Sequence, residues 1–549
     1  MIDVPVLIVG GGPVGLTASI LLSQHGVRSL LAERHPDTAI LPKARGINAR
    51  TMEMYRQCGA EQEIRDAGLP VERTGLIVWT VSLAGEEIER RVPGRATPQN
   101  MAATPVRNCL CAQDDLEPVL RRFAERQGPG ELRFSAEVTG VEQRPDAVTA
   151  NLVDRAGGSE VRVRAQYLIA ADGAQSPIRR MLGVKMHGPE AVYDSVNVLL
   201  KADLRPWTAH RPAALYFVEQ PHLRATFLTI DAADRWGFLV HSLSAYGYTP
   251  ADFTPERSIA LIREAVGVPD LPVEILGVSA WEASARVADR YGHGRIFLAG
   301  DAAHEMPPTG GFGLNTGVQD VHNLAWKLAA VLHGQAETSL LDTYHAERQP
   351  LGTVTTEASL ANSLSMGRTA RQAGAKLPRA EFLNEQGLIF GATYDSAAVI
   401  PDGTPLPHVD DPLTQYVPSA HPGRRAPHVW LERDGARIST IDLVGAHFAL
   451  VTGRDGAAWR DTVARVAGPG LPRIVAHTIG GDGAIADPAG AWSEAYGVGD
   501  DGAVLVRPDG YVAWRSAHAP ADPARALATA LHIVLGRAPR PAHPEVARS

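Results

Sequence analysis

A short stretch that begins at Gly300 gathers several chemically unusual residues: GDAAHEMPPTGGFGLN holds an acid, a histidine, paired prolines and several glycines. The run before it, RIFLAG, has the apolar pattern of a strand, and the run after it has the apolar spacing of a helix. Alone, Asp301 would most often be a helix cap and His304 a packed or surface histidine. Taken whole, the stretch predicts a large polar cofactor lying against the turn between a strand and a helix.

A second glycine-rich turn follows the apolar run Val4–Val9 near the N-terminus. The letters GGGPVG fit the pattern G-x-G-x-x-G, and a helical pattern comes next. Gly10 permits a tight turn, Gly12 lets the backbone approach a pyrophosphate, and Gly15 lets the helix pack closely on the strand. The first helical turn begins at Pro13 and includes Val14, and its residues other than the proline would offer free N–H groups to the phosphates. The turn therefore predicts a dinucleotide site.

An acid ends the second strand of this unit at Glu33. Its carboxylate can accept hydrogen bonds from ribose hydroxyls, and it disfavours a 2′-phosphate. A glycine pattern alone could be an ordinary turn, but here strand, turn, helix, strand and acid fall in register. FAD or NAD is therefore expected rather than NADP.

Two further motifs decide between FAD and NAD. YLIAADGAQSPIRRMLG (Tyr167–Gly183) places Asp172 and Gly173 after a strand, and the stretch from Asp301 to Asn315 has the spacing D-x6-P-x-G-x2-G-L-N. In this order, the three motifs resemble the class A flavoprotein aromatic monooxygenases, the family of para-hydroxybenzoate hydroxylase and phenol hydroxylase. The resemblance extends over most of residues 1–350 and includes SLLDTYHAERQP (Ser339–Pro350).

The resemblance implies a role for each matching residue. Asp301 would bind the ribityl hydroxyls of the flavin, Pro308 would lie beside the reactive edge of the isoalloxazine, and Val138 would contact the adenine through its backbone. No metal site is expected. The implied cofactor-binding residues are Gly10, Gly12, Pro13, Val14, Gly15, Glu33, Arg34, Arg45, Gln113, Val138, Asp172, Gly173, Asp301, Pro308, Gly311, Gly313, Leu314 and Asn315.

The helix that starts near Leu314 would aim its positive N-terminus at the flavin ring, which favours electron density on the reduced ring. Its predicted buried stripe is Val318, Val321, Leu324, Leu328 and Val331.

The segment between Gly183 and Trp281 reads as a series of strands. In the family this region is a sheet that covers the substrate. The aromatic residues that could line an apolar cavity are Tyr216, Phe217, Phe227, Trp236 and Phe238. Sheet core is the alternative for each of them, and because strand residues alternate between faces only some can point inward.

After a proline-rich linker, the tail shows the strand-like runs HFALVTG, RIVAHTIG and AVLVRPDGYVAWRS, and a helix from about Pro523 to Leu535. This arrangement resembles the thioredoxin-like C-terminal domain of phenol hydroxylase and polyketide hydroxylases. There is no CxxC, so packing or oligomerisation is a better expectation than disulfide exchange. VRPDGYVAWR resembles the bacterial aromatic-polyketide hydroxylases, with the tetracenomycin-type enzymes as the nearest group.

The predicted fold is therefore α/β in three parts. Residues 1–182 and 282–400 would form a discontinuous Rossmann-like FAD-binding domain, and residues 183–281 an inserted β-sheet substrate domain. Residues 401–549 would form the thioredoxin-like domain.

Composition limits the function classes. The chain has 549 residues and a formal net charge of −8, which argues against a nucleic-acid partner. Its three cysteines are too few for a disulfide framework and favour a reduced, cytoplasmic setting. No signal peptide is expected, and no apolar run reaches the ~18 residues of a membrane span, so a membrane partner is not expected.

The resemblance implies a FAD-dependent, NAD(P)H-consuming monooxygenase that hydroxylates an aromatic polyketide through a flavin C4a-hydroperoxide. FAD would be bound tightly and non-covalently, NADPH or NADH transiently, and O2 would be the co-substrate of a small aromatic molecule. Baeyer–Villiger oxygenation, antibiotic-inactivating hydroxylation and a flavin-bound, non-catalytic binding protein stay open. A flavin halogenase is disfavoured because KxGxxxWxWxIP is missing.

No residue is identified as the catalytic base, and the candidate catalytic residues are Arg45, Tyr216 and Pro308. The identity of the substrate, the regiochemistry and the choice between NADPH and NADH stay open. So does the oligomeric state, for which a homodimer is one candidate.

Overall fold

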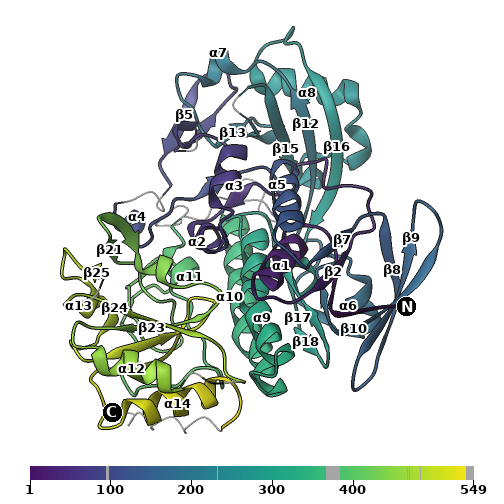
Figure 1. Ribbon diagram of the computed structural model, residues 1–549. Helices are drawn as coiled ribbons and strands as arrows, with labels where there is room; N and C mark the ends of the chain where they lie inside the picture. Colours follow the sequence, from purple (N-terminus) through teal and green to yellow (C-terminus); the bar gives the residue numbers. More distant parts are fainter. Residues whose placement is uncertain are drawn as a thin grey trace.

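The computed structural model describes residues 1–73, 75–93, 98–231, 233–365, 384–466, 468, 470–481 and 484–538. Figure 1 shows three bodies: an eight-stranded sheet with its helices at the lower right, a seven-stranded sheet at the top, and the C-terminal unit at the lower left. Across these ranges, no helix combines the length and the apolar character that a membrane crossing requires. The mixed α/β fold with a separate C-terminal domain is as predicted.

The eight-stranded sheet is built around parallel strands. Its main path is β18 (Gly292–His293), β19 (Ile296–Leu298), β10 (Glu160–Ala170), β1 (Ile2–Val9), β2 (Ser29–Ala32) and β7 (Glu131–Arg133), and β8 (Ala136–Gln143) and β9 (Val148–Asp154) extend it through β10. β1 runs parallel to β2 and β10, and β10 runs parallel to β19. All four residues of β2 are buried, as expected for a strand covered on both faces. The carboxyl ends of β1, β10 and β19 therefore meet at one edge.

Four helices lie close to this sheet: α1 (Pro13–Gln24), α5 (Gln113–Arg126), α9 (Gly313–Leu332) and α10 (Asp342–Ser365). In α9 the predicted stripe is buried at Val318, Val321, Leu324 and Leu328, whereas Val331 is only partly buried. The predicted stripe is narrower than the buried surface of α9, because Trp326 and Ala330 also pack into the core of the C-terminal unit. Figure 1 shows why: α9 and α10 lie between the eight-stranded sheet and that unit.

The seven-stranded sheet has a covered face and an open one. Its order is β16 (Glu274–Ala283), β12 (Tyr193–Lys201), β15 (Arg235–His241), β14 (Arg224–Thr229), β13 (Leu215–Glu219), β4 (Ile77–Thr80) and β5 (Glu87–Arg91). α8 (Pro255–Val266) packs on one face over a separate hydrophobic cluster. β4 and β5 lie outside the predicted segment 183–281, so this sheet is assembled from two distant parts of the chain.

The C-terminal unit contains the predicted strands and helix. β23 (Phe448–Thr452) runs parallel to β24 (Ile474–Thr478), with α12 (Ala457–Val466) between them, and β26 (Ala503–Val506) and β27 (Val512–Ser516) form the hairpin. Gly510 has φ +81° in the hairpin turn, which a glycine adopts without strain. α14 (Pro523–Val534) matches the predicted terminal helix. The last residues of the predicted domain, 539–549, lie outside the described ranges.

The other elements are short or connect these units. The helices are α2 (Ala49–Cys58), α3 (Glu61–Ala67), α4 (Pro98–Ala102), α6 (Pro177–Met181), α7 (Arg205–Thr208), α11 (Gln386–Phe390) and α13 (Trp492–Tyr496). The strands are β3 (Gly46–Ile47), β6 (Cys109–Leu110), β11 (Met186–His187), β17 (Arg286–Ala288), β20 (His304–Glu305), β21 (Trp430–Arg433), β22 (Ala436–Ser439) and β25 (Ile485–Ala486).

A fully buried network of charges joins the C-terminal unit to α9 and α10. The Glu347 carboxylate accepts hydrogen bonds from Arg507 at 2.6 and 2.8 Å and from Lys327 Nζ at 2.7 Å. Arg507 also pairs with Asp509 in the hairpin turn, and Glu53 of α2 pairs with Arg425. Buried charges are stable only when paired in this way. Nothing in the sequence pattern predicts this network.

The C-terminal unit should lose stability in mild acid through His428. Burial, reinforced by the nearby Arg425, lowers the pKa of His428 from 6.5 to about 4. As the pH falls from 6.5 towards 4, the unfolded chain gains a proton that the folded chain does not bind, so folding becomes less favourable, by about 1 to 3 kcal/mol. We expect the melting temperature of the wild type to fall more steeply between pH 7 and 5 than that of His428→Asn.

The control is His408→Asn, which replaces a histidine whose side chain is 89% exposed. This variant should follow the wild type across the same pH range. Equal slopes in the wild type and His428→Asn would contradict the assignment.

Candidate active site

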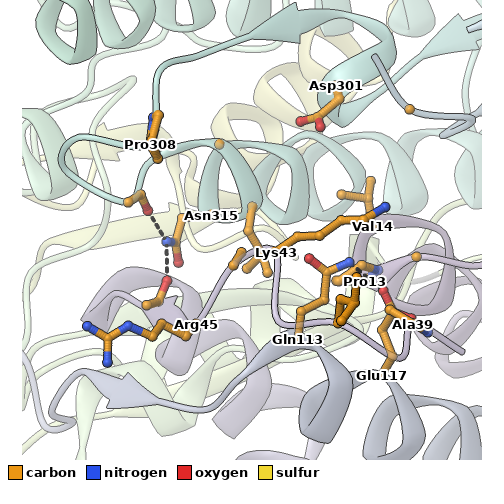
Figure 2. Close-up of a pocket in the computed structure, with 18 of the residues that line it drawn as sticks. Pro13, Val14, Ala39, Lys43, Arg45, Gln113, Glu117, Asp301, Pro308 and Asn315 are labelled. Atoms are coloured by element: carbon orange, nitrogen blue, oxygen red, sulfur yellow. Dashed lines mark hydrogen bonds between the residues drawn. The ribbon is translucent and has the colours of Figure 1, made fainter. Parts of the chain in front are cut away.

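One large cavity lies where the two sheets face each other. Its volume is about 870 Å³, and its wall combines the turns at the carboxyl ends of β1, β10 and β19, the segment 33–48, the start of α5 and the open face of the seven-stranded sheet. Figure 2 shows that Pro13, Gln113, Asp301, Pro308 and Asn315 surround the same space although they are far apart in the sequence. All the predicted cofactor-binding residues except Gly15 line this cavity.

The glycine turn after β1 leaves room on its cavity side. Gly10 has φ +109°, and a Cβ there would lie 2.2 Å from the Ala171 carbonyl oxygen. A Cβ on Gly15 would lie 1.9 Å from the Gly10 oxygen, so Gly15 acts behind the turn. At Gly12 the nearest atom would be Glu117 Oε1, at 3.8 Å, and no side chain caps the N-terminus of α1. The turn therefore offers uncapped N–H groups to an anion, which fits a pyrophosphate.

Glu33 has a second function beside the predicted one. Its Oε2 accepts the Gly11 N–H at 2.6 Å and its Oε1 accepts the His35 N–H at 2.8 Å. The carboxylate thus fixes the glycine turn while it lines the cavity, where a ribose could reach it. Arg34 and Val138 lie in the same part of the wall.

Asp301 lies in the cavity wall, above Val14 in Figure 2, in a short turn that spans Gly300–Ala302. Protein surrounds the carboxyl closely, and this burial raises the pKa of Asp301, while the nearby His304 and Lys43 act in the opposite direction. The side chain nevertheless remains open to the cavity. A carboxyl in this position can accept hydrogen bonds from the hydroxyls of a ligand.

The side chain of Asn315 joins the loop before α9 to the segment 46–48. Asn315 Oδ1 accepts the Asn48 N–H at 2.9 Å, and its Nδ2 donates to the Gly46 and Gly311 oxygens at 2.8 and 2.6 Å (Figure 2). Because the amide is engaged with protein on both sides, Asn315 shapes the loop and leaves backbone groups to face the cavity. Gly311, with φ +70°, and the start of α9 at Gly313 complete this part of the wall.

His304 is a packed histidine rather than a base. It is buried, and its Nε2 lies 2.7 Å from Asp320 Oδ2, which also accepts the Gly300 N–H at 3.1 Å. Arg348 Nε donates to Asp320 Oδ1 at 2.9 Å. Asp320 therefore stabilises the turn that carries Asp301, through the hydrogen bond from the Gly300 N–H.

Asp172 caps a helix beside the cavity. Its Oδ1 accepts the Ser176 hydroxyl at 2.6 Å and its Oδ2 accepts the Ile178 N–H at 3.1 Å, at the start of α6. Burial raises the pKa of Asp172, and these hydrogen bonds oppose the shift. Gly173 follows with φ +83°.

The open face of the seven-stranded sheet supplies the apolar wall. The residues that reach the cavity are Leu215, Phe217, Thr226, Leu228, Leu239 and His241. Of the predicted aromatic residues, Phe217 alone lines it, and Trp79 stacks on Phe217 with centroids 5.1 Å apart. The hydrophobic cluster on the α8 side contains Phe227, Trp236 and Phe238. For these three residues the alternative prediction, burial in the core of the sheet, is correct.

Two of the candidate catalytic residues are engaged with backbone. Tyr216 belongs to the cluster on the α8 side, and its hydroxyl donates to the Arg211 oxygen at 2.9 Å and accepts the Ala213 N–H at 3.0 Å. Strand alternation explains why Tyr216 points away from the cavity while Phe217 points into it. Arg45 lines the cavity, but its guanidinium donates to the Thr229 and Ala214 oxygens at 2.7 Å each and so joins the loop to the sheet. Pro308 lies in the wall, and its place beside the isoalloxazine edge stays a prediction.

Sequence reasoning missed several polar residues in the wall, among them Lys43, Glu117 and His241. The Lys43 side chain extends across the space in Figure 2. His241 is at the end of β15, and its Nδ1 lies 3.1 Å from Ser195 Oγ. The sequence did contain a signal for Glu117: this charged residue lies one helical turn after Gln113, on the same face of α5.

Two family models cover most of the chain. A FAD binding domain matches residues 3–359, and an aromatic-ring hydroxylase C-terminal domain matches residues 419–538.

Individual proteins match over nearly the whole length. The chain is 40% identical to a tetracenomycin B2 monooxygenase-dioxygenase of Streptomyces olivaceus, covering 98% of this chain and 99% of the relative. It is also 40% identical to a 4-methyl-5-nitrocatechol 5-monooxygenase of a Burkholderia species, covering 98% of each. Among solved structures, the flavin-dependent monooxygenase PieE in complex with FAD and substrate superposes with a TM-score of 0.90 at 36% identity, covering 98% of this chain and 100% of that one.

Proposed function

The chain belongs to the family of FAD-dependent aromatic-ring hydroxylases and is a FAD-dependent monooxygenase, and from this premise we propose that its substrate is an aromatic polyketide. NADPH or NADH would be the transient reductant and O2 the co-substrate. One observation carries the proposal: a single cavity joins the dinucleotide cradle to an apolar wall of the seven-stranded sheet. A flat aromatic substrate on this wall would face the cofactor edge beside Pro308.

The residues present fit FAD, and we assign them as follows. The uncapped N-terminus of α1 with Gly10–Val14 would hold the pyrophosphate, Glu33 the ribose, and Asp301 the ribityl hydroxyls. The N-terminus of α9 would face the flavin ring. Bound FAD supplies the electron transfer and the activation of oxygen. The chain supplies placement and, through the apolar sheet face, keeps water from the reacting atoms.

The residues of the sheet wall indicate the kind of substrate that the cavity would bind. Leu215, Phe217, Leu228 and Leu239 offer broad apolar contact, with Thr226 and His241 as polar groups among them. Apolar walls with a few placed polar groups are typical of sites for drug-sized ligands. The tetracenomycin relative favours a polycyclic substrate, and the nitrocatechol relative makes a small phenol the alternative.

We also propose the division into domains 1–182 with 282–400, 183–281, and 401–549, with β4 and β5 completing the sheet of the second domain. A cytoplasmic enzyme without a nucleic-acid partner is supported by the net charge of −8 and by Cys58, Cys109 and Cys111, which are all free and buried.

The test is a panel of aromatic polyketides and small phenols incubated with the purified holoenzyme and NADPH or NADH. We expect a polyketide to accelerate bleaching of the flavin and to yield a product heavier by one oxygen with its ring carbons intact. A product with a ring opened or expanded would indicate Baeyer–Villiger oxygenation instead. If small phenols alone are oxygenated, the polyketide proposal is wrong. If no ligand allows NAD(P)H to bleach the flavin, a non-catalytic binding protein is indicated.

Replacing Asp301 by alanine should weaken FAD binding by at least about tenfold, because hydrogen bonds from the ribityl hydroxyls to a carboxylate are lost. The ratio of the flavin absorbance to the protein absorbance of the purified variant measures this. Asp146→Ala, which changes an exposed acid away from the cavity, is the control and should retain full flavin. Stoichiometric flavin in the Asp301→Ala protein would argue against the assignment.

A further inference from the structure

Helix α5 directs three polar side chains at the loop that residues 36–43 form beside the cavity. Gln113, Glu117 and Arg121 follow each other at four-residue spacing, so they share one face of the helix. Arg121 donates to Asp37 Oδ1 at 2.7 Å, and Glu117 Oε2 accepts the Ala39 N–H at 2.6 Å. These two hydrogen bonds join the loop to the helix.

The two hydrogen bonds differ in environment. Asp37 is 70% exposed, so its ion pair with Arg121 is screened by water and contributes little. Glu117 is 3% exposed, and its second oxygen accepts Gln113 Nε2 at 2.6 Å. A hydrogen bond between a buried carboxyl and a backbone N–H is stronger than one in water. Glu117 is therefore the stronger of the two attachments.

Glu117 also lies against the phosphate turn. A Cβ on Gly12 would lie 3.8 Å from Glu117 Oε1, and Figure 2 shows Gln113, Glu117 and Ala39 close to Pro13. Burial raises the pKa of Glu117, and the Ala39 N–H, Gln113 and Lys43 act in the opposite direction. The carboxyl thus lies between two parts of the cavity wall: it is hydrogen-bonded to the loop at Ala39 and is close to the glycine turn at Gly12.

We propose that Glu117 is a positioning residue for the cofactor, which holds loop 36–43 closed along the bound dinucleotide and thereby slows the release of FAD. This inference rests on the proposed function of the cavity as a FAD site. It makes Glu117 act through the Ala39 N–H and not through contact with the reacting atoms.

The experiment measures the rate at which the holoenzyme releases FAD, followed by the recovery of flavin fluorescence after dilution. Glu117→Ala should release FAD about tenfold faster, because the hydrogen bond to the loop is lost. Glu117→Gln should stay within about twofold of the wild type, because its amide oxygen still accepts the Ala39 N–H. Arg121→Ala, which removes the exposed attachment of the same loop, should also stay within about twofold.

A second readout separates the loop from general stability. Hydrogen exchange of the peptide that covers residues 36–43 should accelerate in holo Glu117→Ala, while α1 and β1 keep wild-type exchange. Release of FAD from Glu117→Ala at the wild-type rate would overturn the inference, and so would a Gln variant as fast as the Ala variant. A wild-type protein that takes up no flavin would overturn the proposed FAD site together with the inference.

Discussion

Replacing Gly10 by alanine is expected to yield a protein without bound FAD. The residue has φ +109°, where any side chain is strained, and the new Cβ would lie 2.2 Å from the Ala171 oxygen and 2.7 Å from the Ala171 carbon. Neither backbone can retreat, because β1 and β10 pair along their length and the Ala171 N–H donates to the Val9 oxygen at 2.8 Å. The turn must therefore open, and the N–H groups that face the phosphates lose their arrangement.

A second variant separates loss of the cofactor from loss of the fold. At Gly12→Ala the nearest atom to the new Cβ would be Glu117 Oε1, at an ordinary contact distance of 3.8 Å, so the apoprotein should fold with a wild-type circular dichroism spectrum. If a pyrophosphate approaches this backbone closely, the methyl group occupies its space and FAD affinity should fall by at least about tenfold. Titration of each apoprotein with FAD, followed by flavin fluorescence, gives the comparison. Wild-type affinity in Gly12→Ala would show that the phosphates lie elsewhere.

Replacing Glu347 by alanine should destabilise the protein by about 3 to 5 kcal/mol. The carboxylate accepts hydrogen bonds from Arg507, Lys327, Asn323 and Ser396. Without it, buried Lys327 loses the carboxylate that it pairs with, and buried Arg507 keeps its pair with Asp509 but loses the second carboxylate. Lys327 can escape by losing its proton, since burial already lowers its pKa to about 8. Arg507 cannot, because a guanidinium keeps its proton in proteins. The cost should therefore be concentrated at the hairpin that carries Arg507.

Thermal unfolding and limited proteolysis of the C-terminal unit measure this effect. Glu357→Ala is the matched control, because Glu357 is an exposed acid on the same helix, α10. It should melt within about 1 °C of the wild type, as surface substitutions usually do. A Glu347→Ala protein that melts with this control would mean that the network contributes little to stability.

The sequence motifs predicted turns that the fold brings together in one cavity wall, because each motif depends on local backbone chemistry. Gly10, Gly173 and Gly311 all have positive φ, which glycine adopts readily, so their spacing reports the turns directly. The pattern around Asp301 and Asn315 likewise marks a turn that lies in this wall, and its contacts with the flavin stay a prediction. Local sequence patterns do not predict hydrogen bonds between residues that are distant in the sequence, such as Arg45 with the Thr229 oxygen or Glu117 with the Ala39 N–H.

The substrate side was harder to predict because each strand has two possible orientations. Tyr216 and Phe217 are adjacent, equally apolar in context and equally buried, yet only Phe217 faces the cavity. Their assignment depends on which face α8 covers, and the strand sequence does not contain that information. The width of the buried surface on α9 was underestimated in the same way, because Trp326 packs against a unit that follows more than a hundred residues later.

The parallel pairing of β13 with β4 has a consequence for engineering. Leu215 to Val218 align with Ile77 to Thr80, so the sheet that lines the cavity is assembled from two separate stretches of polypeptide. A chimera that exchanges only residues 183–281 with a relative would graft five strands onto two that evolved beside a different neighbour. Specificity swaps between such enzymes should therefore carry the hairpin of β4 and β5 along with the donor segment.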